Sequence, residues 1–183
     1  CEPELVDLAG ALTTMGARIR GAGTKTVVIR GVKKLRPLSY RVMPDRIEAG
    51  TLMTAVAMTK GDVLITGAVP GHSAAVMDKL WEGGAVLEEE GGGLRVRGPG
   101  RLRSVDVKTG PYPAFPTDMQ AQFMALLSVS RGLGVITETI FENRFMHAAE
   151  LKRMGADVVV EGNYAIVRGK KSLSGAEVMA TDL

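Results

Sequence analysis

The residues that could carry out chemistry begin with Asp118, which follows Pro116 and Thr117 at the start of a predicted helix. An aspartate in this place can accept a proton from a hydroxyl, as a general base does. It can also be the helix N-cap, which is the more frequent role, and the helix N-terminus favours its charged form and weakens it as a base. Asp45 and Asp182 share this register, and for Asp45 we retain the cap interpretation.

A second group of residues, Ile140, Phe141 and Glu142, lies in a predicted loop between a strand and a helix. Such loops often carry ligand contacts in α/β proteins. The corresponding loop one repeat earlier reads Val69-Pro70-Gly71 and has no charge. The added polarity indicates a binding role, but a solvated Glu142 after a hydrophobic strand end is an equally good interpretation.

Two arginines at helix starts, Arg46 and Arg144, are weaker candidates because arginines there are as often structural. We predict no metal site, since Cys1, His72 and His147 lack ligand-like neighbours. No cofactor motif is present either. The Gly21–Thr26 segment has the composition of a phosphate loop, but a β-run follows it where a helix would have to start, so we predict a hairpin turn.

The composition is that of a soluble globular protein, with 183 residues, 45% hydrophobic and 23% charged. There is no apolar run long enough to cross a membrane. A net charge of +3 and 4% aromatic residues argue against a nucleic-acid partner. The one cysteine excludes an internal disulfide and favours a reducing compartment, so we predict a cytoplasmic protein without a membrane or nucleic-acid partner.

An internal repeat of about 70 residues organises the chain. Its markers are the segments Met15-Gly16-Ala17, Gly83-Gly84-Ala85 and Met154-Gly155-Ala156, whose central glycines lie 68 and 71 residues apart. A second set of glycines, Gly31, Gly98 and Gly169, has spacings of 67 and 71. Each first glycine should cap a helix in the left-handed conformation, and a hairpin should follow.

The full unit is predicted to be β-α-β-α-β-β, in an α/β fold. Helices are expected from the caps at residues 45 and 117–118, and hairpins at 17–30, 86–97 and 158–168. Further strands are expected at 38–42, 63–66, 102–107, 135–139 and 177–179. Because both ends of the chain cut a repeat, we expect a fragment truncated at both ends, with the 180–183 segment starting another helix.

Three segments are recognisable in detail: Tyr40–Glu48 (YRVMPDRIE), Tyr112–Phe123 (YPAFPTDMQAQF) and Ile136–His147 (ITETIFENRFMH). They closely resemble the UDP-N-acetylglucosamine enolpyruvyl transferases of the enolpyruvate transferase family, and the resemblance covers essentially the whole chain. It implies an inside-out α/β barrel in each of two lobes, with helices inside and sheets outside. Residues 1–44 would close the lobe that carries the nucleophilic lid cysteine, and residues 45–183 would form about two units of the second lobe.

The resemblance also implies an activity. The family transfers the enolpyruvyl group of phosphoenolpyruvate to the 3-hydroxyl of UDP-N-acetylglucosamine, the first committed step of peptidoglycan synthesis. Asp118 matches the catalytic carboxylate at that hydroxyl, and Thr117, Ile140, Phe141 and Glu142 match the sugar-nucleotide site. Asp45, Arg46 and Arg144 are weaker candidates, with Arg46 placed for contacts on lobe closure. Cys1 does not match the lid.

From these residues we expect an enolpyruvyl transferase whose isolated 183-residue segment is inactive, since the lid cysteine and most phosphoenolpyruvate contacts lie outside it. We also expect the segment to associate with itself if it exposes apolar repeat faces. The alternative is a non-catalytic, repeat-built α/β module that binds a nucleotide sugar or a protein partner with the same fold.

Overall fold

The computed structural model describes residues 1–180, so the predicted helix start at Thr181 and Asp182 lies outside the described residues. The chain forms two compact units, unit 1 from Cys1 to Pro44 and unit 2 from Asp45 onward. Unit 1 contains helix α1 (Pro3–Thr14) and an antiparallel hairpin of β1 (Arg18–Arg20) and β2 (Val28–Arg30). The Gly21–Thr26 segment forms the turn of this hairpin, as predicted.

Unit 2 contains two successive α/β repeats. The first comprises α2 (Arg46–Met58), β3 (Asp62–Thr66), the 3₁₀ turn η1 (Pro70–His72), α3 (Ala74–Gly83), β4 (Val86–Glu90), β5 (Gly93–Arg97) and β6 (Val107–Lys108). The second comprises η2 (Thr117–Met119), α4 (Gln120–Val129), β7 (Leu133–Thr137), α5 (His147–Arg153), β8 (Asp157–Glu161) and β9 (Tyr164–Arg168). Their strands form two sheets, ordered β3-β5-β4 and β6-β7-β9-β8.

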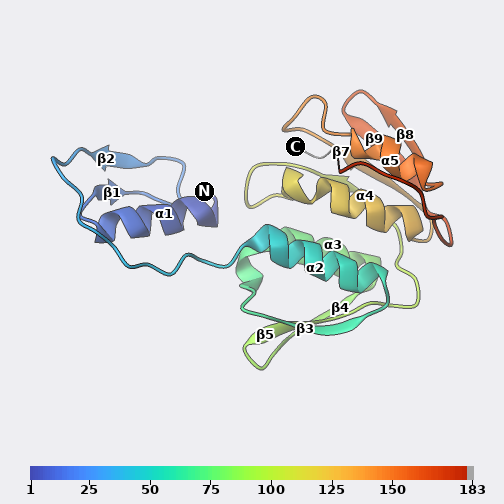
Figure 1. The fold of residues 1–183 in the computed structure, drawn as a ribbon, viewed down its shortest axis with the longest axis horizontal. Helices are drawn as coiled ribbons and strands as arrows, with labels where there is room; N and C mark the ends of the chain where they lie inside the picture. The colour runs from blue at the N-terminus through green and yellow to red at the C-terminus, as the bar shows by residue number, and fades with distance from the viewer. Residues whose placement is uncertain (181–183) are drawn as a thin grey trace. The chain divides into compact units, whose positions relative to one another are not determined.

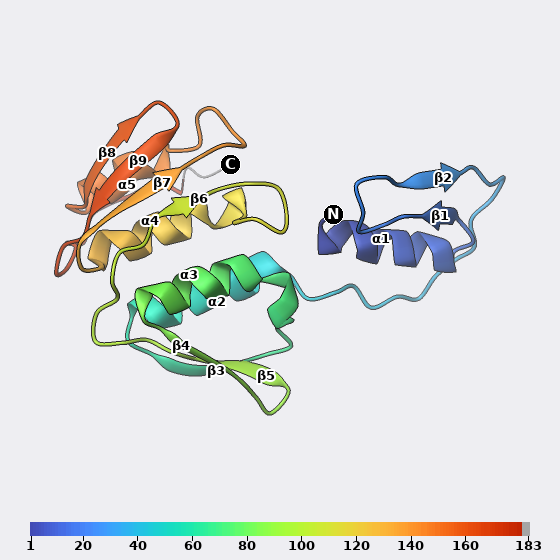
Figure 2. The same cartoon turned by 180° about the vertical axis from the view of Figure 1, so that it is seen from behind.

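The helices of unit 2 lie between its two sheets, as Figures 1 and 2 both show. Helices α2 and α4 pack against each other, and each also contacts strands of its own repeat. The core between them is apolar and fully buried, and its largest side chains are Met53, Leu80, Met119, Phe123 and Leu127. Burying side chains of this size contributes about 1.5–3 kcal/mol each. Helices inside and sheets outside is therefore the observed arrangement within unit 2.

The three predicted helix caps are equivalent in the structure. Gly16, Gly84 and Gly155 all have positive φ, at 106°, 102° and 89°. In each copy the amide of the following alanine donates to a carbonyl five residues back, at 2.9–3.0 Å. This is the Schellman arrangement, in which glycine avoids the steric cost that a Cβ would bring. The repeat predicted from the sequence is confirmed at this point of the fold.

Two predicted strands are wrong. Residues 38–42 and 177–179 are not in any strand, and the strand predicted at 102–107 is reduced to β6 and an isolated bridge at Arg103. Each of the two segments makes a hydrogen bond to a helix side chain instead of pairing with a strand. The Tyr40 hydroxyl donates to Asp7 of α1 at 3.0 Å, and the Met179 amide donates to Glu150 of α5 at 3.1 Å. β-Propensity alone does not make a strand without a ladder partner.

Asp45 is the N-cap of α2, as predicted. Its carboxylate accepts the amides of Ile47 at 2.7 Å and Glu48 at 3.3 Å. Replacing Asp45 with alanine should lower the free energy of unfolding by about 1 kcal/mol, because two N-terminal amides lose their acceptor. Urea denaturation of the 183-residue chain measures this, and Asp45→Asn should restore nearly all of it. Equal losses in the two variants would contradict the cap role.

Candidate active site

Two loops from the same edge of one sheet bring most of the predicted site residues together. Strands β6 and β7 run parallel, so both chains leave the sheet at the same edge. The first loop closes on itself, with the Gly110 amide bonded to the Phe115 carbonyl, and leads into η2. The second follows β7 through residues 138–146 to α5. Residues almost 30 positions apart in the sequence therefore meet in space.

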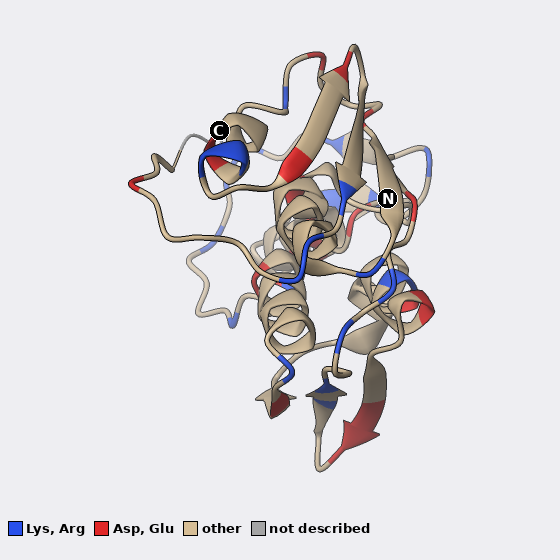
Figure 3. Ribbon diagram, turned by 90° about the vertical axis from the view of Figure 1, so that its right-hand side faces the viewer, with Lys and Arg blue, Asp and Glu red and all other residues tan. Residues whose placement is uncertain are grey.

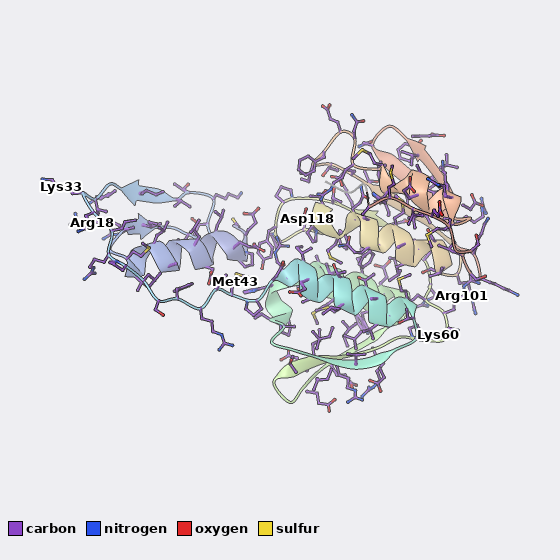
Figure 4. All side chains as sticks on the ribbon, in the orientation of Figure 1. Arg18, Lys33, Met43, Lys60, Arg101 and Asp118 are labelled. Carbon is purple, nitrogen blue, oxygen red and sulfur yellow. The ribbon has the colours of Figure 1, made fainter. Side chains whose placement is uncertain are left out.

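Arg144 and Asp118 form an ion pair across these loops. The Arg144 Nη2 atom lies 2.9 Å from Oδ1 of Asp118, and Nη1 donates to the Thr117 hydroxyl at 3.0 Å. The Arg144 side chain is buried, whereas that of Asp118 is 48% exposed. Figure 4 labels Asp118 at the N-terminal end of α4. The buried guanidinium of Arg144 therefore occupies one side of the Asp118 carboxylate, and the exposed side remains open to a substrate.

Asp118 is not the helix cap that its register predicts. Pro116 takes the N-cap position of η2, and neither η2 nor α4 has a side-chain cap hydrogen bond. The 3₁₀ turn adds backbone before α4, so the Asp118 carboxylate is directed to Arg144 rather than to the backbone amides. The equivalence with Asp45 therefore fails in detail, and the cap interpretation no longer competes with a chemical one.

Glu138 is at the centre of the site, and sequence reasoning missed it. Its side chain is 1% exposed, at the end of β7. The carboxylate accepts hydrogen bonds from both loops: from the hydroxyls of Thr109 and Thr117 at 2.8 Å, the amides of Ile140 at 2.8 Å and Phe141 at 3.3 Å, and the Gln120 side chain at 3.3 Å. A buried carboxylate with this many donors fixes the relative positions of the two loops.

The charged form of Glu138 is favoured by these contacts. Burial by itself raises the pKa of Glu138, but the hydrogen bonds, led by that from the Ile140 amide, outweigh burial and hold the pKa below its ordinary value. Because the folded pKa is the lower one, the ionised carboxylate stabilises the fold above the unfolded pKa. That contribution disappears as the pH falls through the folded pKa.

Replacing Glu138 with glutamine should lower the free energy of unfolding by about 1–3 kcal/mol at neutral pH, since buried donors lose their acceptor. The deficit should begin to shrink when the pH falls below the ordinary value of 4.5, where the unfolded chain takes up a proton, and it should be smallest once the pH falls through the lower pKa of the folded state. Denaturant unfolding of both chains at neutral and acidic pH measures this. The exposed Glu142→Gln is the matched control, and a loss as large in that variant would contradict the role of Glu138.

Ile140 and Phe141 present apolar surface beside this network, with 40% and 53% of their side chains exposed. Their amides already donate to Glu138, so a ligand would have to use their side chains or carbonyls. The Arg144 guanidinium lies 5.2 Å from the centre of the Phe141 ring, which orients that ring. Glu142 is exposed at the outside of the same loop.

Arg46 occupies a different place in unit 2. Its guanidinium lies 5.5 Å from the centre of the Tyr112 ring. Both residues line a pocket between the starts of α2 and α3, together with His72 and Pro116. The structure therefore groups Thr117, Asp118, Ile140, Phe141 and Arg144 around Glu138, and places Arg46 at a neighbouring pocket and Asp45 as a cap.

Within residues 1–180, no three metal-ligating side chains come together. No helix in the described part of the chain is long and apolar enough to cross a bilayer.

The sequence does not reveal the role of Glu138. Its donors Thr109 and Thr117 lie 21–29 positions away in the sequence. A single glutamate among strand residues also gives no signal that its side chain is buried.

Comparison with known proteins gives a consistent family assignment. The sequence model of EPSP synthase (3-phosphoshikimate 1-carboxyvinyltransferase) matches residues 1–183. The UDP-N-acetylglucosamine 1-carboxyvinyltransferase of Desulfosudis oleivorans is 58% identical over 183 residues, and that of Myxococcus xanthus is 56% identical over 182. In both cases the match covers 100% of this chain but only 44% and 43% of the relative. The chain thus spans less than half the length of these relatives.

Solved structures agree with this result. The enolpyruvyl transferase NikO from Streptomyces tendae superposes with a TM-score of 0.79 at 28% identity, covering 92% of this chain and 41% of that one. The EPSP synthase from Acinetobacter baumannii gives 0.55 at 20% identity, over 93% of this chain and 40% of that one, and supports the fold alone. With a family match over its whole length and relatives above 50% identity, the chain belongs to the EPSP synthase family of enolpyruvate transferases.

Proposed function

We propose that the chain is the part of a UDP-N-acetylglucosamine enolpyruvyl transferase that carries the sugar face of its active site. The relatives named for this activity are 56–58% identical over the full chain. The observation that carries the proposal is the pair of Asp118 and Arg144, a half-exposed carboxylate held by a buried arginine. The proposed setting is the cytoplasm, as an early step of peptidoglycan synthesis.

In the proposed reaction, Asp118 takes the proton from the 3-hydroxyl of the sugar as its oxygen bonds to C2 of phosphoenolpyruvate, while the C2=C3 double bond opens and C3 takes up a proton. Phosphate then leaves C2 with the electron pair of its C–O bond, C3 gives up a proton, and the double bond forms again. Arg144 orients the carboxylate through their ion pair. Thr117 bonds both Glu138 and Arg144, which fixes it next to Asp118. Ile140, Phe141 and Glu142 form the wall that receives the nucleotide sugar, and Arg46 contributes contacts from the neighbouring pocket.

The proposal includes a lobe arrangement. Unit 1 would close the lobe that carries the nucleophilic cysteine, and unit 2 would supply two of the repeats of the other lobe, in an inside-out α/β barrel. The helix-inside order of unit 2 supports this architecture. Phosphoenolpyruvate would be held mostly by residues outside the 183, which is why we expect no turnover from this chain by itself.

A segment exchange tests the proposal. Residues 1–183 replace the matching 44% of the Desulfosudis oleivorans relative, and we call the product the exchanged enzyme. We expect it to release phosphate from phosphoenolpyruvate only when UDP-N-acetylglucosamine is present. An exchanged enzyme that melts cooperatively, binds the nucleotide sugar and releases no phosphate would favour the alternative, a non-catalytic module of the same fold.

A further inference from the structure

The charges of the chain are unevenly divided between its units. Unit 1 holds eight Lys and Arg residues and three Asp and Glu residues, whereas unit 2 holds 15 and 17. All three acids of unit 1 lie before residue 8, so residues 8–44 contain none. The modest net charge of +3 therefore conceals a strongly basic first unit.

The side chains on the outer face of each hairpin can be compared at equivalent positions of the three repeats. The arginine just before the closing glycine recurs as Arg30, Arg97 and Arg168. In unit 2 it has an acidic partner on the neighbouring strand: Arg97 lies 2.8 Å from Glu88, and Arg168 lies 3.7 Å from Asp157. Red and blue segments accordingly lie close together on the three-stranded sheet of unit 2 (Figure 3).

In unit 1 the same positions are all basic. Arg18 stands where Asp157 stands in the last repeat, and Arg20 stands where Glu88 stands in the middle one. Arg30 is directly opposite Arg18 in the ladder, and all three side chains are exposed. Within the described residues none of the three has a carboxylate partner. Together with Val28 they line a shallow hollow beside the end of α1.

Like charges directly opposite in a ladder destabilise a hairpin. The fold accepts an acid at each of these two positions, because Asp157 occupies the first in the last repeat and Glu88 the second in the middle repeat. The arginines of unit 1 break the pattern of the other repeats and lower the stability of the hairpin. This departure indicates a surface that serves a function other than folding. Lys33, Lys34 and Arg36 continue the positive charge beyond β2, and Figure 4 labels Arg18 and Lys33 at the same end of the hairpin.

We propose that this basic face of unit 1, formed by Arg18, Arg20, Arg30, Lys33 and Lys34, docks on an anionic phospholipid surface, a partner that the composition of the whole chain does not predict. Clusters of four to eight basic residues adsorb to such bilayers through diffuse charge. Unit 1 includes no Phe or Trp, and its one tyrosine, Tyr40, is bonded to Asp7. Single-stranded nucleic acid needs aromatic stacking platforms, and the cores of protein interfaces are depleted in charged residues, so the lipid surface fits this face better.

Co-sedimentation of the 183-residue chain with vesicles tests the proposal. We expect binding at low salt to phosphatidylcholine vesicles containing about one third phosphatidylglycerol, and none to pure phosphatidylcholine. Raising the salt concentration should release the chain, because screening shortens the reach of its charges. Each basic residue strengthens such adsorption about five-fold, so losing two should weaken it by about 25-fold or more.

The double variant Arg18→Asp/Arg20→Glu is the sharpest probe, since it installs the acids that the other repeats carry at these positions. It should fold at least as stably as the wild type, which circular dichroism melting checks, and it should lose vesicle binding. The variant Lys170→Glu/Lys171→Glu changes the net charge by the same amount in unit 2. It should retain binding within about three-fold, as it leaves the basic face intact.

Three results would overturn the proposal. One is equal sedimentation with neutral and anionic vesicles, and another is an equal loss of binding in both double variants, which would reflect bulk charge alone. The third is binding to a short DNA duplex without binding to anionic vesicles, which would assign the face to nucleic acid. None of these results bears on the sugar site, because the basic face belongs to unit 1 and the Asp118 network to unit 2.

Discussion

Replacing Asp118 with asparagine should lower kcat of the exchanged enzyme by at least about 100-fold. General bases typically contribute about 100-fold to 10,000-fold, and asparagine cannot take the proton of the 3-hydroxyl. The fold should be little affected. Asparagine keeps an oxygen that can accept from Arg144, so the buried guanidinium retains a hydrogen-bond partner. Steady-state phosphate release and urea denaturation measure the two quantities.

Asp45→Asn is the internal control for this experiment. Asp45 caps α2, and asparagine is about as good a cap, so both rate and stability should change little. A small and equal loss of rate in the two variants would mean that Asp118, like Asp45, is only structural. A large loss of stability in Asp118→Asn would likewise remove the argument that its effect is chemical.

Replacing Gly169 with alanine should destabilise the 183-residue chain by about 3 kcal/mol or more, the largest stability effect that we expect. A Cβ at Gly169 would lie 1.8 Å from the Ser130 carbonyl oxygen and 2.9 Å from that of Leu127. These are backbone atoms at the end of α4, so no side chain can move aside, and the strand or the helix must shift. Denaturant unfolding measures the loss.

The control lies in the same unit. A Cβ at Gly100 meets nothing within 4 Å, and its φ is not in the left-handed region, so Gly100→Ala should change stability by less than about 1 kcal/mol. Gly31, the equivalent of Gly169 in unit 1, is also open. Equal effects at Gly169 and Gly100 would show that the contact with α4 does not constrain the repeat.

The features that the sequence predicts correctly are those in which local chemistry and repetition agree. Glycine caps, hairpin turns and the Asp45 cap depend on residues within one turn of each other, and each prediction is confirmed by backbone geometry or hydrogen bonds. The segments at 38–42 and 177–179 fail because a strand depends on a partner elsewhere. There the structure has Tyr40 bonded to α1 and Met179 bonded to α5.

The candidate site likewise has residues that the sequence indicated and one central residue that it did not. Resemblance located Asp118, Ile140 and Phe141, but it did not indicate what holds them in place. Glu138 does so through donors from segments distant in the sequence, and burial of a carboxylate follows only from the assembled fold. The cap predicted for Asp118 failed because Pro116 and a 3₁₀ turn displaced its register, which a comparison with Asp45 alone does not reveal.

A crystal structure of the exchanged enzyme with UDP-N-acetylglucosamine bound would show whether Asp118 contacts the reacting hydroxyl. We expect an Asp118 carboxylate oxygen within about 2.6–3.2 Å of the sugar 3-hydroxyl, with Arg144 still bonded to the other side of that carboxylate. We also expect the nucleotide sugar to lie against Ile140 and Phe141. A sugar whose 3-hydroxyl lies beyond hydrogen-bond reach of Asp118, or that binds away from these two loops, would contradict the assignment.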